Sequence, residues 1–482
     1  MKKASAFEKV AARCWNVLNE GKPFTPVFVV GTFLIYTLLQ GAGQISWPSF
    51  ALAVVWSLPV FAVYYAFDFP LHLRVFLWLP AALQIWMFPG ADFALYALGL
   101  GLYIFFTVFF WGTIYYHLRI GTPWTNYRRF WKLVLKNSDS TSGNAQEQLP
   151  KVWLLLGLLA WFYAHPLGGM PRHIVVYAVF AACLWLYAWA VHKLLFTWKP
   201  HELPPTKREG ALSAIAEKVY IVIIDGCRKD RLAEADTPFI DWLRAEGTEF
   251  ASMETIYPDR TVVCFSSMFT GTYPREHGIK SNMVWRLGVR CESVFDSLRK
   301  VGKTGKLLGI AHLVDSFGDD VETVTAVMKN DEADANIMLR AKDIVERHDP
   351  DLLIVQLIAT DQTGHSRGAL YEEYKQKIAE ADRHIADFYA WLKARGLLDD
   401  AVFIVAADHG QSDGIGGHGH LDEGERYVPF FMAGKGIRKG HLVTSKHSLV
   451  SVTPTICRLL GAPLPDKSRG PVLAEAFKEE IR

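Results

Sequence analysis

The charged and apolar residues of this 482-residue chain are divided unevenly between its two halves, and this limits its fold more than any average does. Residues 1–200 contain 15 Lys/Arg, 6 Asp/Glu and 13 of the 16 tryptophans, whereas residues 201–482 contain 36 Lys/Arg and 43 Asp/Glu. The net charge of +2 therefore hides a basic half and an acidic half. This division excludes a uniform soluble globule, and the composition excludes a disordered chain or a disulfide-stapled scaffold.

Six stretches of the basic half are apolar enough to suggest transmembrane helices, which need about 20 residues each. They are residues 25–43, 48–67, 73–90, 92–117, 152–169 and 173–197. Their cores contain no Asp, Glu, Lys or Arg, which favours an anchor over a transporter. Residues 1–24 are polar and amphipathic, unlike a signal peptide. The sequence therefore predicts a membrane domain of about six helices over residues 25–197.

Basic loops predict the orientation of this domain, because such loops stay in the cytoplasm. The segments 1–24 and 118–151 are rich in Lys and Arg, and four predicted spans separate them. Two further spans would return the chain to the cytoplasm, and the four cysteines of the acidic half, which form no CxxC motif, agree with a reducing compartment. We expect a protein of a prokaryotic cell membrane with its acidic half in the cytoplasm. The loss of one span would place that half outside.

The acidic half has the pattern of an α/β domain. Residues 198–216 have the proline-rich, charged composition of a linker. Beyond them, strand-like runs at Val219–Ile224, Leu352–Ile358 and Val402–Ala406 alternate with helical stretches at Asp236–Gly247 and Tyr371–Gly396. This alternation predicts a mostly parallel sheet, covered by helices on both faces, over residues 217–482. Ligands of such sheets bind at the carboxyl ends of the strands.

Polar clusters follow each of the three predicted strands. Asp225 follows the first; Asp361 and His365 follow the second; Asp408 and His409 follow the third, with His418 and His420 just beyond. Carboxylate and imidazole groups together suit zinc and similar divalent cations. Two such ions ~4 Å apart need about six or seven ligands. The three clusters and Thr261 provide that number, with either His418 or His420 completing the set.

A further cluster, residues 258–271, is predicted to be a loop that enters a short helix. The N-terminus of a helix presents backbone N–H groups to a phosphoryl group. Thr261, Cys264, Ser266 and Ser267 all compete for the role of nucleophile in this segment. A threonine that only caps the helix is the alternative interpretation of Thr261.

The order of these motifs, DG-x-R-x-D, T-x9-G, D-x3-H, DHG and HG, resembles the alkaline phosphatase superfamily. It is most similar to the type I phosphodiesterase/nucleotide pyrophosphatase branch and to the glycolipid ethanolamine-phosphate transferases. The resemblance covers residues 217–470 and includes the phrases TGTYPREHGI and VPFFMAGKGI. It implies an alkaline phosphatase-like fold and a membrane-anchored, metal-dependent phosphoric ester hydrolase. A phospho-head-group transferase is the alternative, followed by a sulfatase, although Cys264 lacks the Pro and Arg of a sulfatase motif.

The resemblance also implies roles for individual residues. Thr261 would be the nucleophile that carries a phosphothreonine intermediate, because it lies ten residues before Gly271. The metal ligands fall into two sets: Asp225, Asp408 and His409 with Thr261 for one ion, and Asp361, His365 and His418, with His420 as a substitute, for the other. The ions would be zinc, with manganese as the alternative.

Substrate contacts are implied for three more residues. Cys264 stands where the related phosphodiesterases often carry an asparagine that binds phosphoryl oxygens, and Arg260 and Arg228 could steady a phosphate. Gln411 replaces the methionine that commonly follows the DHG motif. A phosphorylated small molecule or lipid is the expected substrate. The acidic half has no basic stripe for nucleic acid, and its complete ligand set argues against a non-catalytic sensor or transporter.

Overall fold

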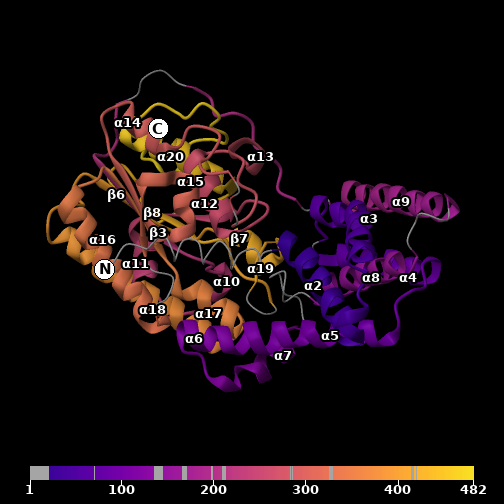
Figure 1. Cartoon of the computed structure of the whole chain (residues 1–482). Coiled ribbons are helices and arrows are strands. Elements are labelled where there is room, and N and C mark those ends of the chain that lie inside the picture. The colour runs from indigo at the N-terminus through magenta and orange to yellow at the C-terminus, as the bar shows by residue number, and fades with distance from the viewer. Residues whose placement is uncertain are drawn as a thin grey trace. The chain divides into compact units, whose positions relative to one another are not determined.

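The computed structural model of the chain describes residues 21–69, 71–134, 145–165, 171–196, 199–208, 213–282, 284, 286–324, 329–413, 417–419 and 421–481. These residues form two compact units, and each is described by itself (Figure 1). The helical unit comprises mainly Trp15–Tyr115 and Trp124–Lys199, and the α/β unit comprises mainly Pro200–Arg482. Most of the predicted N-terminal segment 1–24 lies outside the described residues.

Helices account for nearly all of the described chain before residue 196. They are α2 (Gly21–Gly41), η1 (Ala42–Gln44), α3 (Trp47–Ala66), η2 (Leu71–Leu77), α4 (Trp78–Met87), α5 (Phe93–Ile104), the π-helical η3 (Phe105–Tyr115), α6 (Tyr116–Ile120), η4 (Trp124–Asn126), α7 (Tyr127–Val134), α8 (Ala145–Ala164) and α9 (Pro171–Leu195). Polar caps begin two of the apolar helices: the side chains of Ser46 and Asp92 accept backbone N–H groups at the starts of α3 and α5.

By length and composition, four described segments could cross a membrane, rather than the six predicted. They are Phe24–Gln44, Trp47–Ala66, Phe93–Leu118 and Arg172–Leu195. The third predicted span, residues 73–90, contains only the ten-residue α4 after a seven-residue 3-10 helix. An α-helix of that length is shorter than the hydrocarbon core of a bilayer.

The fifth predicted span corresponds to α8, which lies at the centre of the helical unit. It packs against α2, α3, α4 and α5, and most of its residues are buried. A helix enclosed by other helices is apolar on all sides, so hydropathy alone does not distinguish it from a membrane span. If only four segments cross, the basic segments 1–24 and 118–151 lie on opposite sides. The basic loops then no longer agree on one orientation.

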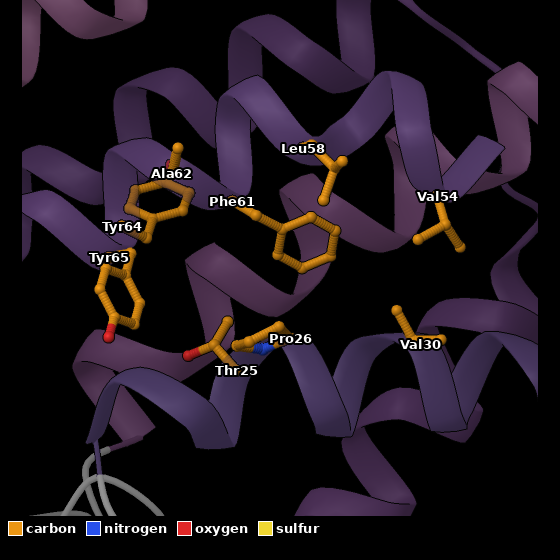
Figure 2. Close-up of a pocket in the computed structure, with 9 residues that line it drawn as sticks. All are labelled: Thr25, Pro26, Val30, Val54, Leu58, Phe61, Ala62, Tyr64 and Tyr65. Atoms are coloured by element: carbon orange, nitrogen blue, oxygen red, sulfur yellow. The ribbon is translucent and has the colours of Figure 1, made fainter. Parts of the chain in front are cut away.

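An apolar cavity of about 410 Å³ lies between α2 and α3 (Figure 2). Its lining comes from the Thr25–Val30 segment of α2 and the Val54–Tyr65 segment of α3. Thr25, Tyr64 and Tyr65 carry hydroxyl groups, and the other lining side chains are hydrocarbon.

The α/β unit is built on one nine-stranded sheet in the order β4-β3-β5-β1-β6-β8-β2-β7, with β9 paired to β2. The strands are β1 (Lys218–Ile224), β2 (Thr248–Glu254), β3 (Gly305–Ile310), β4 (Val321–Val324), β5 (Leu352–Leu357), β6 (Ala401–Ala406), β7 (Tyr427–Val428), β8 (Phe430–Gly434) and β9 (His441–Ser448). From β4 to β6 the pairing is parallel, whereas β8 is antiparallel to both β6 and β2.

Helices lie on both sides of this sheet, which confirms the predicted fold class. The helices α11 (Pro238–Glu246), α16 (Asn330–His348) and α18 (Glu372–Lys393) lie on one side (Figure 1). On the other side lie α12 (Thr261–Thr270), α14 (Val294–Arg299) and α20 (Val452–Leu460). The shorter helices are α10 (Lys229–Glu234), α13 (Pro274–His277), α15 (Val314–Phe317), α17 (Ala359–Arg367) and α19 (Glu423–Arg426), with 3-10 turns at η6 (Ala311–Leu313), η7 (Gly318–Asp320), η8 (Leu449–Ser451), η9 (Ala474–Ala476) and η10 (Glu479–Ile481).

The three strands predicted from apolar runs are β1, β5 and β6, and they are neighbours at the centre of the sheet. All three are fully or almost fully buried. Strands buried on both faces lack polar alternation, which explains why the sequence predicts them well. Their parallel register brings their carboxyl ends to one edge of the sheet.

The predicted linker is packed against the α/β unit where it is described. The Thr206 hydroxyl lies 2.9 Å from the Ser468 hydroxyl, and the Leu203 backbone N–H donates to the Tyr273 hydroxyl at 2.8 Å. These contacts make residues 200–208 part of the α/β unit rather than a free connection.

Candidate active site

Asp225 and Asp408 lie in the loops that follow β1 and β6, and both are next to the backbone of Gly226. Asp225 follows β1, and Asp408 lies just past the end of β6. The backbone N–H of Gly226 donates to Asp408 Oδ1 at 3.1 Å. Gly226 has a φ of 65°, and a Cβ at this position would lie 2.7 Å from the carboxylate of Asp361. A glycine is therefore needed for this close approach.

Thr261 is the first residue of α12, and its side chain points toward the same loops. It is buried, and its Oγ1 lies 3.2 Å from His409 Nε2. The same imidazole nitrogen lies 3.3 Å from Asp408 Oδ2 and 3.4 Å from Asp225 Oδ1. One nitrogen thus faces three oxygen atoms from three separate segments of the chain.

The hydrogen bonds of His409 fit a cation at this position. Its Nδ1 lies 2.9 Å from the carbonyl oxygen of Gly410, to which an Nδ1–H would donate. In the neutral ring, Nε2 then carries a lone pair that faces the oxygens of Asp225 and Asp408. Those two oxygens, Asp225 Oδ1 and Asp408 Oδ2, are buried and have no hydrogen-bond partner within the described parts of the chain. The lone pairs of these two oxygens and of His409 Nε2 point toward the same position. Such an arrangement is typical of the ligands of a divalent cation.

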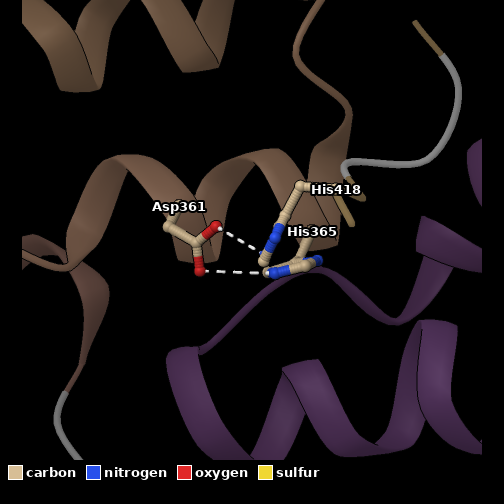
Figure 3. A group of neighbouring side chains, drawn as sticks. All are labelled: Asp361, His365 and His418. Atoms are coloured by element: carbon tan, nitrogen blue, oxygen red, sulfur yellow. Dashed lines mark ion pairs between the residues drawn. The ribbon is translucent and has the colours of Figure 1, made fainter. Parts of the chain in front are cut away.

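A second group of potential metal ligands comes from α17 and from His418. Asp361 and His365 lie one turn apart on α17, and His365 Nε2 is 3.3 Å from Asp361 Oδ2. His418 Nε2 is 3.7 Å from Asp361 Oδ1, so both imidazoles approach the same carboxylate (Figure 3). The Nδ1 of His418 contacts the carbonyl oxygen of Asp259 at 2.6 Å, which leaves Nε2 for a ligand.

The two groups are adjacent. Ligand atoms within 4.8 Å of one another occur in Asp361, His365 and His418, and also in Asp225, Asp361 and His409. Asp361 belongs to both sets, and the rings of His409 and His418 stack with centroids 3.7 Å apart. The structure therefore brings together all seven residues of the predicted metal set. His420, the substitute for His418, lies outside the described residues.

The ionised carboxylates of Asp225 and Asp408 are unfavourable in this buried site when no cation is bound. Burial, followed by repulsion from Asp408 and Asp361, raises the pKa of Asp225 well above its ordinary value. Burial also raises the pKa of Asp408, whereas burial and the neighbouring His409 hold the pKa of His418 well below its usual range. Buried carboxylates next to neutral imidazoles are the state that a bound cation favours.

The sequence of the α/β unit identifies the family of this site. Over residues 219–300 and 303–455 it matches the family described as type I phosphodiesterase / nucleotide pyrophosphatase. The α/β unit contains a type I phosphodiesterase/nucleotide pyrophosphatase domain. The family description and the matched relatives are those of phosphoric ester hydrolases, which is the enzyme class expected from the motifs.

Curated relatives of the phosphodiesterase domain fall into two kinds. Mouse ectonucleotide pyrophosphatase/phosphodiesterase family member 7 is 26% identical over 228 residues, which are 42% of this chain and 52% of that protein. The catalytic subunit of human GPI ethanolamine phosphate transferase 2 is 25% identical over 285 residues, which are 55% of this chain and 29% of that protein. The chain thus spans between about a quarter and about half of the length of such relatives.

Among solved structures, murine ectonucleotide pyrophosphatase/phosphodiesterase 5 aligns with 52% of this chain and 97% of its own. The sequence identity of that pair is 14% and the TM-score is 0.46.

Two buried glutamines of the phosphodiesterase domain hold its aspartates. Gln356 on β5 donates to Asp225 Oδ2 at 2.6 Å, and Gln411 donates from Nε2 to Asp361 Oδ1 at 2.5 Å. The Gln411 side chain fits between two glycines: a Cβ on Gly226 would lie 2.7 Å from its Nε2, and a Cβ on Gly364 would lie 2.8 Å from its Cδ. The residue that departs from the expected DHG-Met pattern therefore orients a predicted metal ligand.

Replacing Gln411 is expected to weaken metal binding. In Gln411→Met the hydrogen bond to Asp361 is lost while the volume is kept, and zinc affinity should fall about tenfold to a hundredfold. Calorimetric titration of the metal-free protein with zinc measures this change. Gln376→Met, an exposed glutamine on α18, is the matched control and should bind zinc as the wild type does. Unchanged affinity in Gln411→Met would show that the amide does not position Asp361.

The other predicted nucleophiles lie in the core. Cys264 is fully buried and its sulfur contacts the Thr255 hydroxyl at 3.4 Å. Burial raises the pKa of this thiol well above its ordinary value. Ser266 donates to the Val262 carbonyl at 2.6 Å, and Ser267 lies 2.9 Å from His277 Nε2. Of the four candidates, Thr261 is the one that contacts His409.

The predicted arginines have different environments. The Arg228 guanidinium contacts Asp230 and Asp413 at 2.6 Å each and donates to the carbonyl of Gln411 at 3.0 Å. Its charge is therefore balanced by two carboxylates, and it also contacts the backbone at Gln411. Its contact with a substrate stays a prediction. Arg260 precedes α12, and its carbonyl oxygen accepts the N–H of Cys264 at 2.8 Å.

Asn282 is a site residue that the sequence did not reveal. Its Oδ1 accepts the backbone N–H of Val262 at 3.0 Å, so its carboxamide lies beside the residue that follows Thr261. The two residues are 20 positions apart in the sequence, and Asn282 lies in an irregular loop.

Proposed function

We propose that the phosphodiesterase domain hydrolyses phosphoric esters with Thr261 as its nucleophile. The observation that carries this proposal is the 3.2 Å contact between Thr261 Oγ1 and His409 Nε2, within a buried cluster of carboxylates and imidazoles. A hydroxyl at the first position of α12 also lies where backbone N–H groups and the positive end of the helix favour a phosphoryl group.

The donor set fits two divalent cations, zinc or manganese. Asp225, Asp408, His409 and Thr261 would hold one ion, and Asp361, His365 and His418 would hold the other. When bound, the ions would lower the pKa of the Thr261 hydroxyl and stabilise negative charge on the phosphoryl oxygens.

The residues of the chain would then act in two steps. Thr261 Oγ1 attacks phosphorus, the bond from phosphorus to the leaving oxygen breaks, and the hydroxyl proton of Thr261 passes to water. The product of this step is a threonine ester of the phosphoryl group. Water then attacks phosphorus, and the bond to Thr261 Oγ1 breaks and restores the hydroxyl. The carboxamide of Asn282 lies beside Val262, where it can orient phosphoryl oxygens over α12.

Transfer to an alcohol is the second candidate, because one curated relative is a GPI ethanolamine phosphate transferase. The two reactions share the first step and differ only in the acceptor of the second. Mass spectrometry of the products from an aryl phosphodiester, without glycerol and with glycerol at a low concentration, separates them. We expect the free phosphomonoester in both samples. A dominant glycerol phosphodiester at low glycerol concentration would favour the transferase.

We also propose that the helical unit anchors the enzyme in a cell membrane, with the phosphodiesterase domain on the cytoplasmic side. Four apolar segments support the anchor, and free thiols at Cys227, Cys264, Cys291 and Cys457 suit a reducing compartment. An even number of spans keeps the N-terminus and the domain on one side. Protease should cleave the domain in inside-out vesicles and spare it in right-side-out vesicles. The reverse pattern would place the site outside the cell.

A further inference from the structure

The helix α17, which carries the predicted metal ligands Asp361 and His365, has no capping side chain of its own. It begins at Ala359, and Ile358, the residue that separates it from the buried strand β5, makes no side-chain capping hydrogen bond. The N–H groups of the first turn of a helix have no partner within the helix, and leaving them unpaired in a buried site is costly. The position of both ligands therefore depends on the group that accepts these N–H groups.

Asp334 on α16 is that acceptor. Its Oδ1 accepts the backbone N–H of Ile358 at 2.9 Å and that of Ala359 at 3.1 Å, and its side chain is buried. Burial raises the pKa of Asp334 to about 6, so its carboxyl group is ionised at about pH 7.5. A negative charge at this end of a helix also interacts favourably with the helix dipole. Asp334 thus caps α17 from a different helix.

A second residue of α16 contacts the same helix. Asn330 lies four residues before Asp334, so the two side chains share one face of α16. Its Nδ2 donates to Thr363 Oγ1 at 2.7 Å, and the Thr363 hydroxyl in turn donates to the carbonyl of Ala359 at 2.8 Å. The α16 helix therefore holds α17 at two points, at its first turn and at Thr363, which lies between the two predicted ligands.

We infer that Asn330 and Asp334 are positioning residues for the second metal ion of the site. They hold α17 where the side chains of Asp361 and His365 meet His418 (Figure 3). Neither residue belongs to the predicted ligand set, so both act through the helix that they hold. The inference rests on the proposed two-ion site. It concerns the ion assigned to α17 and His418 and predicts little effect on the ion assigned to the aspartates that follow β1 and β6.

Calorimetric titration of the full chain in mild detergent, freed of metal, with zinc at about pH 7.5 tests this inference. The wild type should bind two ions per chain, and His365→Ala identifies the second. Asp334→Ala should lower the affinity for that same ion by at least about tenfold and leave the affinity for the other ion within about threefold. Asp334→Asn keeps an oxygen that can accept both N–H groups, so its affinity should lie between those of Asp334→Ala and the wild type. A wild type that binds fewer than two ions would overturn the two-ion site itself.

Asp382→Ala is the matched control, because Asp382 caps α11 from α18 in a similar way. Its carboxylate accepts the N–H groups of Phe239 at 3.1 Å and Ile240 at 2.8 Å, in the first turn of a helix that carries none of the predicted metal ligands. Both alanine variants should lower the melting temperature of the metal-free protein. Only Asp334→Ala should weaken zinc binding.

A second pair of variants tests the other contact between α16 and α17. Asn330→Ala keeps the cap and loses the hydrogen bond to Thr363, so the affinity for the second ion should fall by about threefold to tenfold. Its control is Asn336→Ala on the same helix, which removes a side chain that donates to the Glu332 carbonyl at 2.7 Å. This variant should bind both ions as the wild type does.

Three results would overturn the positioning role. Equal weakening of zinc binding in Asp382→Ala would show that loss of any helix cap has this effect. Wild-type affinity for both ions in Asp334→Ala and Asn330→Ala would show that the contacts between α16 and α17 do not position the ligands. If Asp334→Ala does not fold, wild-type affinity in Asp334→Asn and Asn330→Ala would lead to the same conclusion.

Discussion

Thr261→Ala is expected to lower the rate of phosphodiester hydrolysis by at least about a thousandfold, because it removes the atom that attacks phosphorus. The side chain is buried at the start of α12, and its loss deletes one small polar group next to His409. The domain should therefore remain folded, and thermal unfolding of the variant checks this. Steady-state kinetics on an aryl phosphodiester, with zinc or manganese supplied, measures the loss.

Two control variants distinguish the role of the Thr261 hydroxyl from that of nearby groups. Thr261→Ser keeps a hydroxyl at the same position and should retain much of the activity. Ser266→Ala removes a competing hydroxyl from the same helix, one that donates to the Val262 carbonyl at 2.6 Å, and should stay close to the wild type. Activity in Thr261→Ala within tenfold of the wild type would contradict the role of Thr261.

Removal of the divalent ions is expected to abolish hydrolysis and to destabilise the phosphodiesterase domain. At a free metal concentration of about 100 times Kd, a bound ion adds about 2.7 kcal/mol to the free energy of unfolding. Chelation should then lower the melting temperature by about 5–10 °C. Asp408→Asn should have the same effect on activity and should bind zinc weakly. Calorimetry and thermal unfolding with and without chelator measure both changes.

The destabilisation should grow as the pH rises. The pKa values of Asp225 and Asp408 lie above their unfolded values because both groups are buried, so their protonated forms favour the folded, metal-free state. This contribution is complete below the ordinary carboxyl pKa of about 4 and is lost as pH rises through the higher folded values. The metal-loaded domain should lack this loss, because the ions balance the ionised carboxylates.

Asp382→Asn provides the matched control for the metal prediction. Asp382 is also a buried carboxyl of the α/β unit, but it accepts the backbone N–H groups of Phe239 and Ile240. Its replacement should leave zinc affinity unchanged even if it lowers stability. A wild-type zinc stoichiometry in Asp408→Asn would remove this residue from the metal set.

Most of the site could be predicted because its residues follow buried parallel strands. The runs Val219–Ile224 and Val402–Ala406 are apolar without alternation, and parallel pairing brings their carboxyl ends together. Asp225 and Asp408 then lie close together as a consequence of topology alone. The spacing of Asp361 and His365 likewise fits one turn of α17.

Other features could not be predicted, because local sequence carries no information on three-dimensional neighbours. Cys264 lies one turn after Thr261, but on the side of α12 that faces the core, and the sequence alone did not show which side that was. Asn282 reaches Val262 through an irregular loop that has no periodic pattern. In the helical unit, α8 is enclosed by other helices, and hydropathy alone does not distinguish such a buried helix from one that faces lipid.

The central claim, a covalent intermediate on Thr261, is tested most directly by acid quenching of the metal-loaded enzyme during turnover of an aryl phosphodiester. Peptide mass spectrometry of the quenched protein should find the phosphoryl ester on Thr261, and on the serine in Thr261→Ser. The ester should be absent from Thr261→Ala. An intermediate on any other residue, or full turnover without a covalent adduct in both the wild type and Thr261→Ser, would contradict the account.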